Sequence, residues 1–194
     1  QLTMEPGTVF GGRPPAGLPD DDLSYAMQRA CQDELAAAGY AQYEISAYAR
    51  AGSQCAHNLN YWRFGDYLGV GAGAHGKLTQ PLAGTDVANA AIIRTVRERE
   101  PRRYLARGHA AAPEAMTVAR ADLPFEFMMN ALRLVEGFEA DLFETRTGLA
   151  WSELAGPVGS LTERGLLESI PQEAAGWRPT ELGRHFLNDV ITEF

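Results

Sequence analysis

Tyr67-Leu68-Gly69-Val70-Gly71-Ala72-Gly73-Ala74-His75-Gly76 is the stretch on which the interpretation of the fold depends. Residues 67–70 are typical of a short buried strand, and the last three glycines match the spacing of a dinucleotide fingerprint or, with Lys77, nearly that of a P-loop. Both motifs need a helix directly afterwards, and Pro81 follows too soon for one. We therefore reject a Rossmann or ATPase site. The glycines are expected to let two backbone segments approach closely, with a flat ligand on bare backbone as the open alternative.

The residues before this stretch predict a strand, a helix and a second strand. Residues 2–4 are a short strand that leaves into a turn, residues 20–38 are a helix, and residues 43–46 are a strand. Asp20 suits the N-terminus of the helix and Gly39 its C-terminal end. The apolar stripe expected on this helix consists of Leu23, Met27, Ala30, Cys31 and Leu35. The order strand, helix, strand favours a parallel α/β unit.

A second, mainly helical unit is predicted from Gly108 onward. We therefore expect one domain over residues 1–107 and another over residues 108–194. The expected elements are helices at 122–135, 139–147 and 151–164, a hairpin of 166–170 with 176–179, and a last helix capped by Thr180. Helices followed by a hairpin and a helix are typical of a winged-helix-like module.

The charge distribution argues against a nucleic-acid partner. The net charge is −8, and residues 1–107 hold 11 basic and 11 acidic side chains, so they are balanced. Residues 108–194 hold 6 basic and 14 acidic side chains and would repel a phosphate backbone, whatever their winged-helix pattern suggests. No apolar run approaches the roughly 20 residues that span a bilayer, and no signal peptide is visible. A cytoplasmic protein is the default expectation.

The cysteines and basic residues leave several interpretations open. Cys31 and Cys55 are the two cysteines, and nothing in their setting demands a disulfide. Cys55 and His57 offer two metal ligands, but no other Cys–His cluster completes a zinc site. A basic stretch suits carboxylates such as porphyrin propionates, and a solvated helical face explains it equally well. This stretch contains Arg94, Arg97, Arg99, Arg102, Arg103 and Arg107.

The block His57-Asn58-Leu59-Asn60-Tyr61-Trp62 is the strongest chemical signal in the chain. An imidazole beside two aromatic rings can ligate haem iron while the rings flank the macrocycle. The alternative is a loop in which Tyr61 and Trp62 plug the core while His57 caps a turn. From the residues alone, packing is the better interpretation.

Three segments together resemble the oxygen-independent coproporphyrinogen III oxidase superfamily, specifically its HemW branch. They are Tyr43-Glu44-Ile45-Ser46-Ala47-Tyr48-Ala49-Arg50, His57-Asn58-Leu59-Asn60-Tyr61-Trp62-Arg63 and Asp66-Tyr67-Leu68-Gly69-Val70-Gly71-Ala72-Gly73-Ala74-His75-Gly76. The resemblance covers essentially the whole chain. It implies an α/β fold: the C-terminal part of a partial (β/α) radical-SAM barrel, followed by a mainly helical, winged-helix-like HemN C-terminal domain.

The resemblance also implies cofactors. Members of the superfamily hold a [4Fe-4S] cluster on a Cys-x₃-Cys-x₂-Cys motif and bind S-adenosylmethionine (SAM) at its unique iron. That motif is absent here, and Cys31 and Cys55 lie 24 positions apart, so we expect the chain to begin inside a larger protein and to be inactive alone. The resemblance also implies that Thr3, Ala74 and His75 correspond to places where the oxidase lays backbone against SAM.

In the HemW branch the His-Asn-x-x-Tyr-Trp block is implicated in haem binding. By that match His57 is the expected ligand of the haem iron, supported by Asn58, Tyr61 and Trp62. The resemblance implies a haem chaperone that passes haem to an acceptor protein, and radical decarboxylation of coproporphyrinogen III is the alternative. Half a barrel leaves open strand edges, so we expect the isolated chain either to cover that edge with its C-terminal domain or to self-associate.

Overall fold

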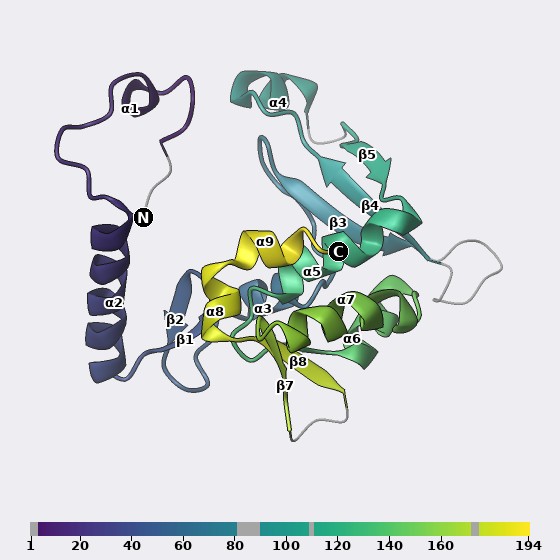
Figure 1. The fold of residues 1–194 in the computed structure, drawn as a ribbon. Coiled ribbons are helices and arrows are strands. Elements are labelled where there is room, and N and C mark those ends of the chain that lie inside the picture. Colours follow the sequence, from purple (N-terminus) through teal and green to yellow (C-terminus); the bar gives the residue numbers. More distant parts are fainter. Residues whose placement is uncertain (1–3, 81–89, 109–110, 172–174) are drawn as a thin grey trace. The chain divides into compact units, whose positions relative to one another are not determined.

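The structure is a computed structural model, and it describes residues 4–80, 90–108, 111–171 and 175–194 (Figure 1). The chain divides into two compact units, Gln1–Ala41 and Gln42–Phe194. Each unit is described by itself below.

The first unit contains a short helix α1 (Val9–Gly12) and the long helix α2 (Asp21–Ala37). The capping predictions for α2 are confirmed, since the Asp20 carboxylate accepts a hydrogen bond from Leu23 N at 2.8 Å and Gly39 adopts a φ of +82°. The predicted apolar stripe does not pack within this unit, and the side chain of Met27 is 55% exposed. The strand expected at residues 2–4 lies largely outside the described residues.

The second unit begins with a two-stranded sheet. Strands β1 (Ala41–Glu44) and β2 (Ala47–Ala49) pair with each other, joined by a turn at Ile45 and Ser46. The predicted strand 43–46 therefore ends at Glu44, and its regular ladder partner is the neighbouring strand rather than a parallel strand across a helix. Helix α3 (Ala56–Trp62) follows, so the block of residues 57–62 lies on a helix.

The prediction of a buried strand at residues 67–70 is wrong. Only Tyr67 makes a bridge, to Lys77, and Leu68 and Val70 are 76% and 83% exposed. Gly71 and Gly73 adopt positive φ and turn the chain back on itself, so the regular strand comes after the glycines rather than before them. This strand, β3 (His75–Gln80), pairs antiparallel with β4 (Ala91–Val96), which pairs antiparallel with β5 (Glu114–Thr117).

The close backbone approach expected from the glycines is confirmed. A Cβ added to Gly69 would lie 2.5 Å from the carbonyl oxygen of His75, and one added to Gly76 would lie 2.5 Å from Thr95 Oγ1. No helix follows the glycines, because residues 75–80 form β3. The rejection of the nucleotide motifs is therefore supported by the backbone.

The C-terminal part has the predicted winged-helix-like order. Its elements are the turn η2 (Arg120–Asp122), α5 (Leu123–Ala131), β6 (Phe138–Glu139), α6 (Ala140–Thr147), α7 (Ser152–Glu163), β7 (Leu167–Ser169), β8 (Gly176–Pro179), α8 (Glu181–His185) and α9 (Leu187–Ile191). The predicted hairpin is confirmed, and β8 also pairs with β6, which gives the sheet order β6-β8-β7. Thr180 caps α8 by accepting from Gly183 N at 3.0 Å, and the predicted single last helix is broken at Phe186.

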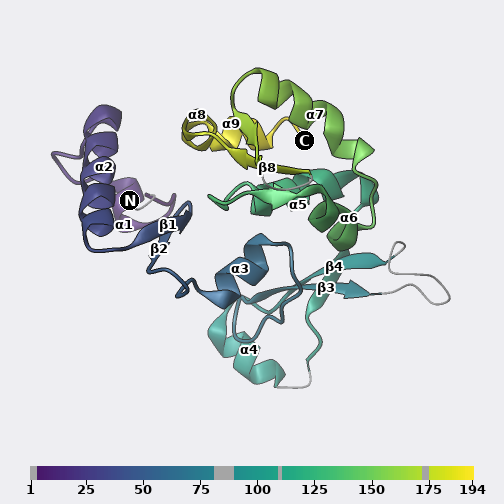
Figure 2. The ribbon, with the colours of Figure 1, turned by 90° about the horizontal axis from the view of Figure 1, so that it is seen from below.

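The core of the second unit is centred on Phe127 of α5, which is fully buried. The Phe127 ring makes edge contacts with Phe64, Phe138 and Phe143 at centroid distances of 5.7, 5.8 and 5.2 Å. In Figure 2, α5, α6 and α7 lie together with β8. Because Phe64 lies two residues beyond α3, the end of that helix is fixed by the same core. Across the described ranges, no helix is both long and apolar enough to cross a membrane.

Candidate functional site

Helix α3 carries the four residues expected to bind haem. Asn58, Tyr61 and Trp62 recur at helical spacing on one face, and all three are partly buried against the rest of the unit. His57 lies in the first turn with its side chain exposed. The structure therefore separates the block into three residues that contact the protein and one imidazole that faces solvent.

The inner face of α3 rests on tyrosines from two other segments. Asn58 Nδ2 donates a hydrogen bond to Tyr43 Oη at 3.1 Å, which ties the start of the helix to β1. The Tyr61 ring packs edge-on to Trp62 at 4.7 Å and against Tyr67 at 4.8 Å between centroids. These contacts hold the helix along its length, because they involve residues from both of its ends.

Trp62 lies beneath a guanidinium group. Arg133 Cζ is 4.3 Å from the centre of the Trp62 ring, and Arg133 Nη2 is 3.2 Å from both Glu44 Oε2 and Ser46 Oγ. Within the described residues Trp62 Nε1 is buried without a hydrogen-bond acceptor. One face of the indole is thus occupied by Arg133 and is closed to any planar ligand.

A buried ion pair fixes the chain just after α3. Phe64 adopts a φ of 54°, and its carbonyl oxygen accepts a hydrogen bond from Lys77 Nζ at 3.0 Å. Lys77 is 1% exposed and also donates to Asp66 Oδ1 at 2.9 Å. Asp66 accepts two further hydrogen bonds, from Thr79 N and Thr79 Oγ1, each at 2.8 Å. Lys77, the lysine of the rejected P-loop, is therefore committed to the interior and does not face a phosphate.

The protonation of this pair follows from its burial. Burial raises the pKa of Asp66, but the hydrogen bonds from Lys77 and Thr79 outweigh it and leave the pKa below its ordinary value. Burial lowers the pKa of Lys77, and Asp66 offsets only part of that effect. Each group therefore stabilises the charged form of the other, whereas burial by itself disfavours both charges.

Tyr67 connects α3 to the sheet and to α5. Arg94 Nη1 donates to Tyr67 Oη at 3.0 Å, while Arg94 Nη2 pairs with Glu126. Burial is the main cause that raises the pKa of Tyr67 to about 12, and the neighbouring phenol of Tyr61 is the second. Arg94 lowers this pKa but offsets only part of the increase. Tyr67 is a neutral phenol at physiological pH.

The three residues expected to contact SAM are only partly described. Thr3 lies outside the described residues. Ala74 precedes β3, and its carbonyl oxygen accepts a hydrogen bond from Arg97 N at 2.9 Å. His75 begins β3 with an exposed side chain. The backbone of Ala74 is thus already hydrogen-bonded within the protein, while the side chain of His75 is free to meet a ligand.

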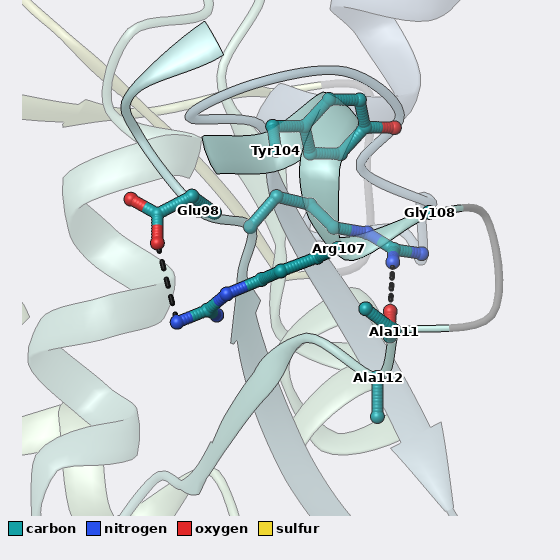
Figure 3. A pocket seen from close by; sticks show the side chains of 7 residues that line it. Glu98, Tyr104, Arg107, Gly108, Ala111 and Ala112 are labelled. Carbon is teal, nitrogen blue, oxygen red and sulfur yellow. Dashed lines mark hydrogen bonds and ion pairs between the residues drawn. The ribbon is translucent and has the colours of Figure 1, made fainter. Parts of the chain in front are cut away.

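The basic stretch is divided between internal contacts and solvent. Arg97 Nη1 donates to the carbonyl oxygen of Ala111 at 2.8 Å. Arg107 pairs with Glu98 at 3.3 Å (Figure 3). The hollow between these groups and Tyr104 has a volume of about 10 Å³, roughly that of one water molecule. This hollow cannot hold a porphyrin.

The described residues contain no cluster that could hold a metal ion through three or more His, Cys, Asp or Glu side chains. Cys31 and Cys55 are free and exposed, and they belong to different units of the chain. These two cysteines do not fit the ligand set of a [4Fe-4S] cluster.

Comparison with known proteins first defines the class of protein. Residues 118–186 match the family model of the HemN C-terminal domain. The fold matches the crystal structure of the radical SAM enzyme HemN, coproporphyrinogen III oxidase from Escherichia coli, with a TM-score of 0.59 over 92% of this chain and 42% of that one. The sequences of the two are 14% identical, so this likeness concerns the fold alone. It confirms the expected fold class, a mixed α/β radical-SAM-type fold with a HemN C-terminal domain.

Sequence similarity then identifies the branch. The chain is 44% identical over all 194 residues to the haem chaperone HemW of Haemophilus influenzae and 43% identical to that of Escherichia coli. It spans about half the length of these relatives, 47% and 48% respectively. The chain is similar to HemW over its whole length, which confirms the resemblance.

Two residues that shape the site, Tyr43 and Arg133, were not expected from the sequence to do so. Tyr43 was expected only as part of a strand, and Arg133 only as a position in a predicted helix. Arg133 lies 71 positions after Trp62, so no local pattern connects the two residues. The residues around Glu44 do not predict that this side chain is buried beside an arginine.

Proposed function

We propose that the protein is a haem chaperone, which binds haem and transfers it to an acceptor protein. The observation that carries the proposal is the similarity to HemW over every residue of the chain at 43–44% identity. The geometry of α3 supports it, because this helix presents an exposed imidazole on a rigid, well-anchored support.

In this proposal His57 ligates the haem iron. The side chain of His57 is exposed, and no contact within the described residues competes for its ring nitrogens. Tyr61 lies one helical turn further on, where it packs against Trp62 and Tyr67, so in this proposal it supports the helix and remains a predicted contact of the macrocycle. Asn58 and Trp62 support binding indirectly, because Asn58 fixes α3 to Tyr43 and Trp62 fixes it to Arg133.

The superfamily implies a [4Fe-4S] cluster and SAM in the complete protein. Cys31 and Cys55 cannot supply a Cys-x₃-Cys-x₂-Cys motif, so we assign no cluster ligand to this chain. Thr3, Ala74 and His75 remain predicted SAM contacts, of which His75 has the exposed side chain. No step of haem binding at His57 is assigned to either group.

The proposed partners are haem and a haem-acceptor protein, in the cytoplasm, without nucleic acid. Self-association of the isolated chain remains a prediction. It is supported by exposed apolar side chains such as Leu68 and Val70, which a lone half-barrel leaves uncovered.

The test is a haem titration of the complete protein carrying His57→Ala. We expect the affinity to fall and the Soret band to shift, because the iron loses its protein ligand. His185→Ala is the matched control, since it removes an exposed histidine from α8, outside the block. Equal affinity and an unchanged Soret band in His57→Ala would exclude His57 as the ligand.

Oxidative decarboxylation of coproporphyrinogen III is the second candidate, favoured by the match of residues 118–186 to the family model of the HemN C-terminal domain. The reconstituted complete protein and a HemN control would be assayed for product side by side. Turnover at the rate of the control would favour the oxidase; its absence beside an active control would favour the chaperone.

A further inference from the structure

Arg133 contacts both the β1–β2 turn and α3. Its carbonyl oxygen accepts a hydrogen bond from Ile45 N at 3.1 Å, and its guanidinium reaches Glu44 and Ser46 at 3.2 Å. The same guanidinium covers the Trp62 ring at 4.3 Å. One residue just beyond α5 therefore binds both the β1–β2 turn and the last residue of α3.

The burial of these groups shows that the contact is specific. The side chain of Glu44 is 3% exposed and that of Arg133 is 27% exposed, so the pair is largely removed from water. Within the described residues Arg133 Nε is buried without a hydrogen-bond partner, as expected when the planar group is held by stacking. A lysine could replace the charge but could not cover the indole with a flat group.

The direction of His57 depends on the tilt of α3. Asn58 fixes the start of this seven-residue helix to Tyr43, and Trp62 fixes its end to Arg133. His57 lies five residues before Trp62, about 7.5 Å along the helix axis. Loss of the contact at Trp62 frees the indole at the last residue of α3, while Asn58 and the buried Phe64 still hold the chain at either end. We therefore expect a change in the tilt of the helix between these two anchors, and with it a change in the direction of the first-turn imidazole.

We propose that Arg133 is a positioning residue for haem binding: by stacking on Trp62 while paired with Glu44, it sets the tilt of α3 and hence the direction of the His57 imidazole. The inference rests on the proposed function. It adds that the HemN C-terminal domain, to which Arg133 belongs, takes part in forming the haem site.

The experiment compares Arg133→Lys and Glu44→Gln with the control Arg164→Lys in the complete protein. Arg164 forms an exposed ion pair with Glu193, so its replacement by lysine changes an arginine that does not touch α3. The first measurement is the indole N–H resonance of Trp62 in the haem-free protein, assigned by its loss in Trp62→Phe. We expect the resonance to move in Arg133→Lys and to stay in place in Arg164→Lys.

The second measurement uses ferric haem. We expect Arg133→Lys to bind haem more weakly by up to about fivefold, because returning α3 to the binding tilt costs at most the energy of the lost cation–π contact. We also expect the electron paramagnetic resonance g-values of the bound iron to change. A merely structural role would lower the folded fraction but leave the g-values of the folded complex unchanged. Glu44→Gln keeps the shape of the side chain but removes the charge that pairs with Arg133, and it replaces Arg133→Lys in the test if that variant does not fold. We expect Glu44→Gln to change the g-values in the same direction as Arg133→Lys.

The outcomes separate the two proposals. The role of Arg133 would be overturned if folded Arg133→Lys showed unchanged g-values and an unmoved indole resonance. If only Glu44→Gln folds, unchanged g-values in that variant would overturn it. Unchanged haem binding in His57→Ala would instead overturn the proposed ligand, whatever the Trp62 resonance does.

Discussion

Replacing Asp66 by alanine tests the interpretation of the buried ion pair. The change leaves Lys77 in the interior with the carbonyl oxygen of Phe64 as its remaining acceptor among the contacts described above. A buried charge without its counter-charge is costly, so the free energy of unfolding should fall.

The magnitude follows from the exposure of the two partners. Removing one member of a buried pair costs about 3–5 kcal/mol. The side chain of Lys77 is 2% exposed but that of Asp66 is 40% exposed, and the Phe64 carbonyl oxygen still accepts a hydrogen bond. The lower end of the range applies, about 3 kcal/mol, which corresponds to a decrease of roughly 6–12 °C in Tm for a chain of this size.

The deficit should depend on pH in a defined direction. In Asp66→Ala the folded-state pKa of Lys77 falls further below its ordinary value, because burial is no longer offset. Between the folded and unfolded pKa values the unfolded chain binds more protons, so the stability of the variant rises with pH. The deficit therefore shrinks from pH 7 toward about pH 10, near the ordinary pKa of lysine. The difference in stability between wild type and Asp66→Ala also shrinks in acid. As pH falls through the lowered pKa of Asp66, wild type loses the stability that the ionised carboxylate gives, and the variant has no such carboxylate to lose.

Urea denaturation at several pH values measures both effects. Thr79→Val is the matched control, because it removes the hydroxyl hydrogen bond to Asp66 and leaves both charges in place. Its deficit should be about 1 kcal/mol and constant between pH 7 and pH 10, where Asp66 stays ionised. A deficit in Asp66→Ala that is constant between pH 7 and pH 10 would refute the reasoning.

Two further predictions concern Tyr67 and a tightly packed glycine. Tyrosinate absorbance should show a transition near pH 12 that is lost in Tyr67→Phe. Because the folded pKa is raised, wild type should lose more stability than this variant as pH rises from about 10 to 12; uniform titration near pH 10 would contradict the assignment. Gly183→Ala should cost about 2 kcal/mol or more, since its Cβ would lie 1.9 Å from the carbonyl oxygen of Leu166. In Gly156→Ala of α7 the added Cβ meets open space, so the free energy of unfolding should rise by about 0.5–1 kcal/mol. Equal urea midpoints for the two glycine variants would contradict the packing argument.

The elements that were correctly predicted are those with local signals. Asp20 and Thr180 begin helices because their side chains accept hydrogen bonds from the backbone three residues later. The hairpin of β7 and β8 pairs two short segments that lie close together in the sequence. Capping and periodicity act within a few residues, so one sequence suffices to detect them.

The elements that were missed depend on distant parts of the chain. Residues 67–70 have strand-forming side chains, but the positive φ of Gly71 and Gly73 makes them fold back along β3 with Leu68 exposed. Strand propensity is decided by neighbours rather than by the residues alone.

The candidate site was located from the sequence, but its internal organisation was not. The His-Asn-x-x-Tyr-Trp block is recognisable as a motif, and helical spacing accounts for the shared face of Asn58, Tyr61 and Trp62 once α3 is known. That Trp62 lies under Arg133 could not be inferred, since this contact spans 71 residues and arises from the packing of α5.

The long-range supports of α3 bear on the order of events during synthesis. A helix of seven residues is unstable by itself, and α3 is secured by Arg133 and by the ion pair of Arg63 with Glu136 at 2.5 Å, which lies 73 residues further along the chain. Closing loops of this length costs entropy that only the finished contacts repay. A nascent chain can therefore make the contacts of α3 with Tyr43 and Tyr67 early, but it cannot complete the support of this helix until residues 133–136 have left the ribosome.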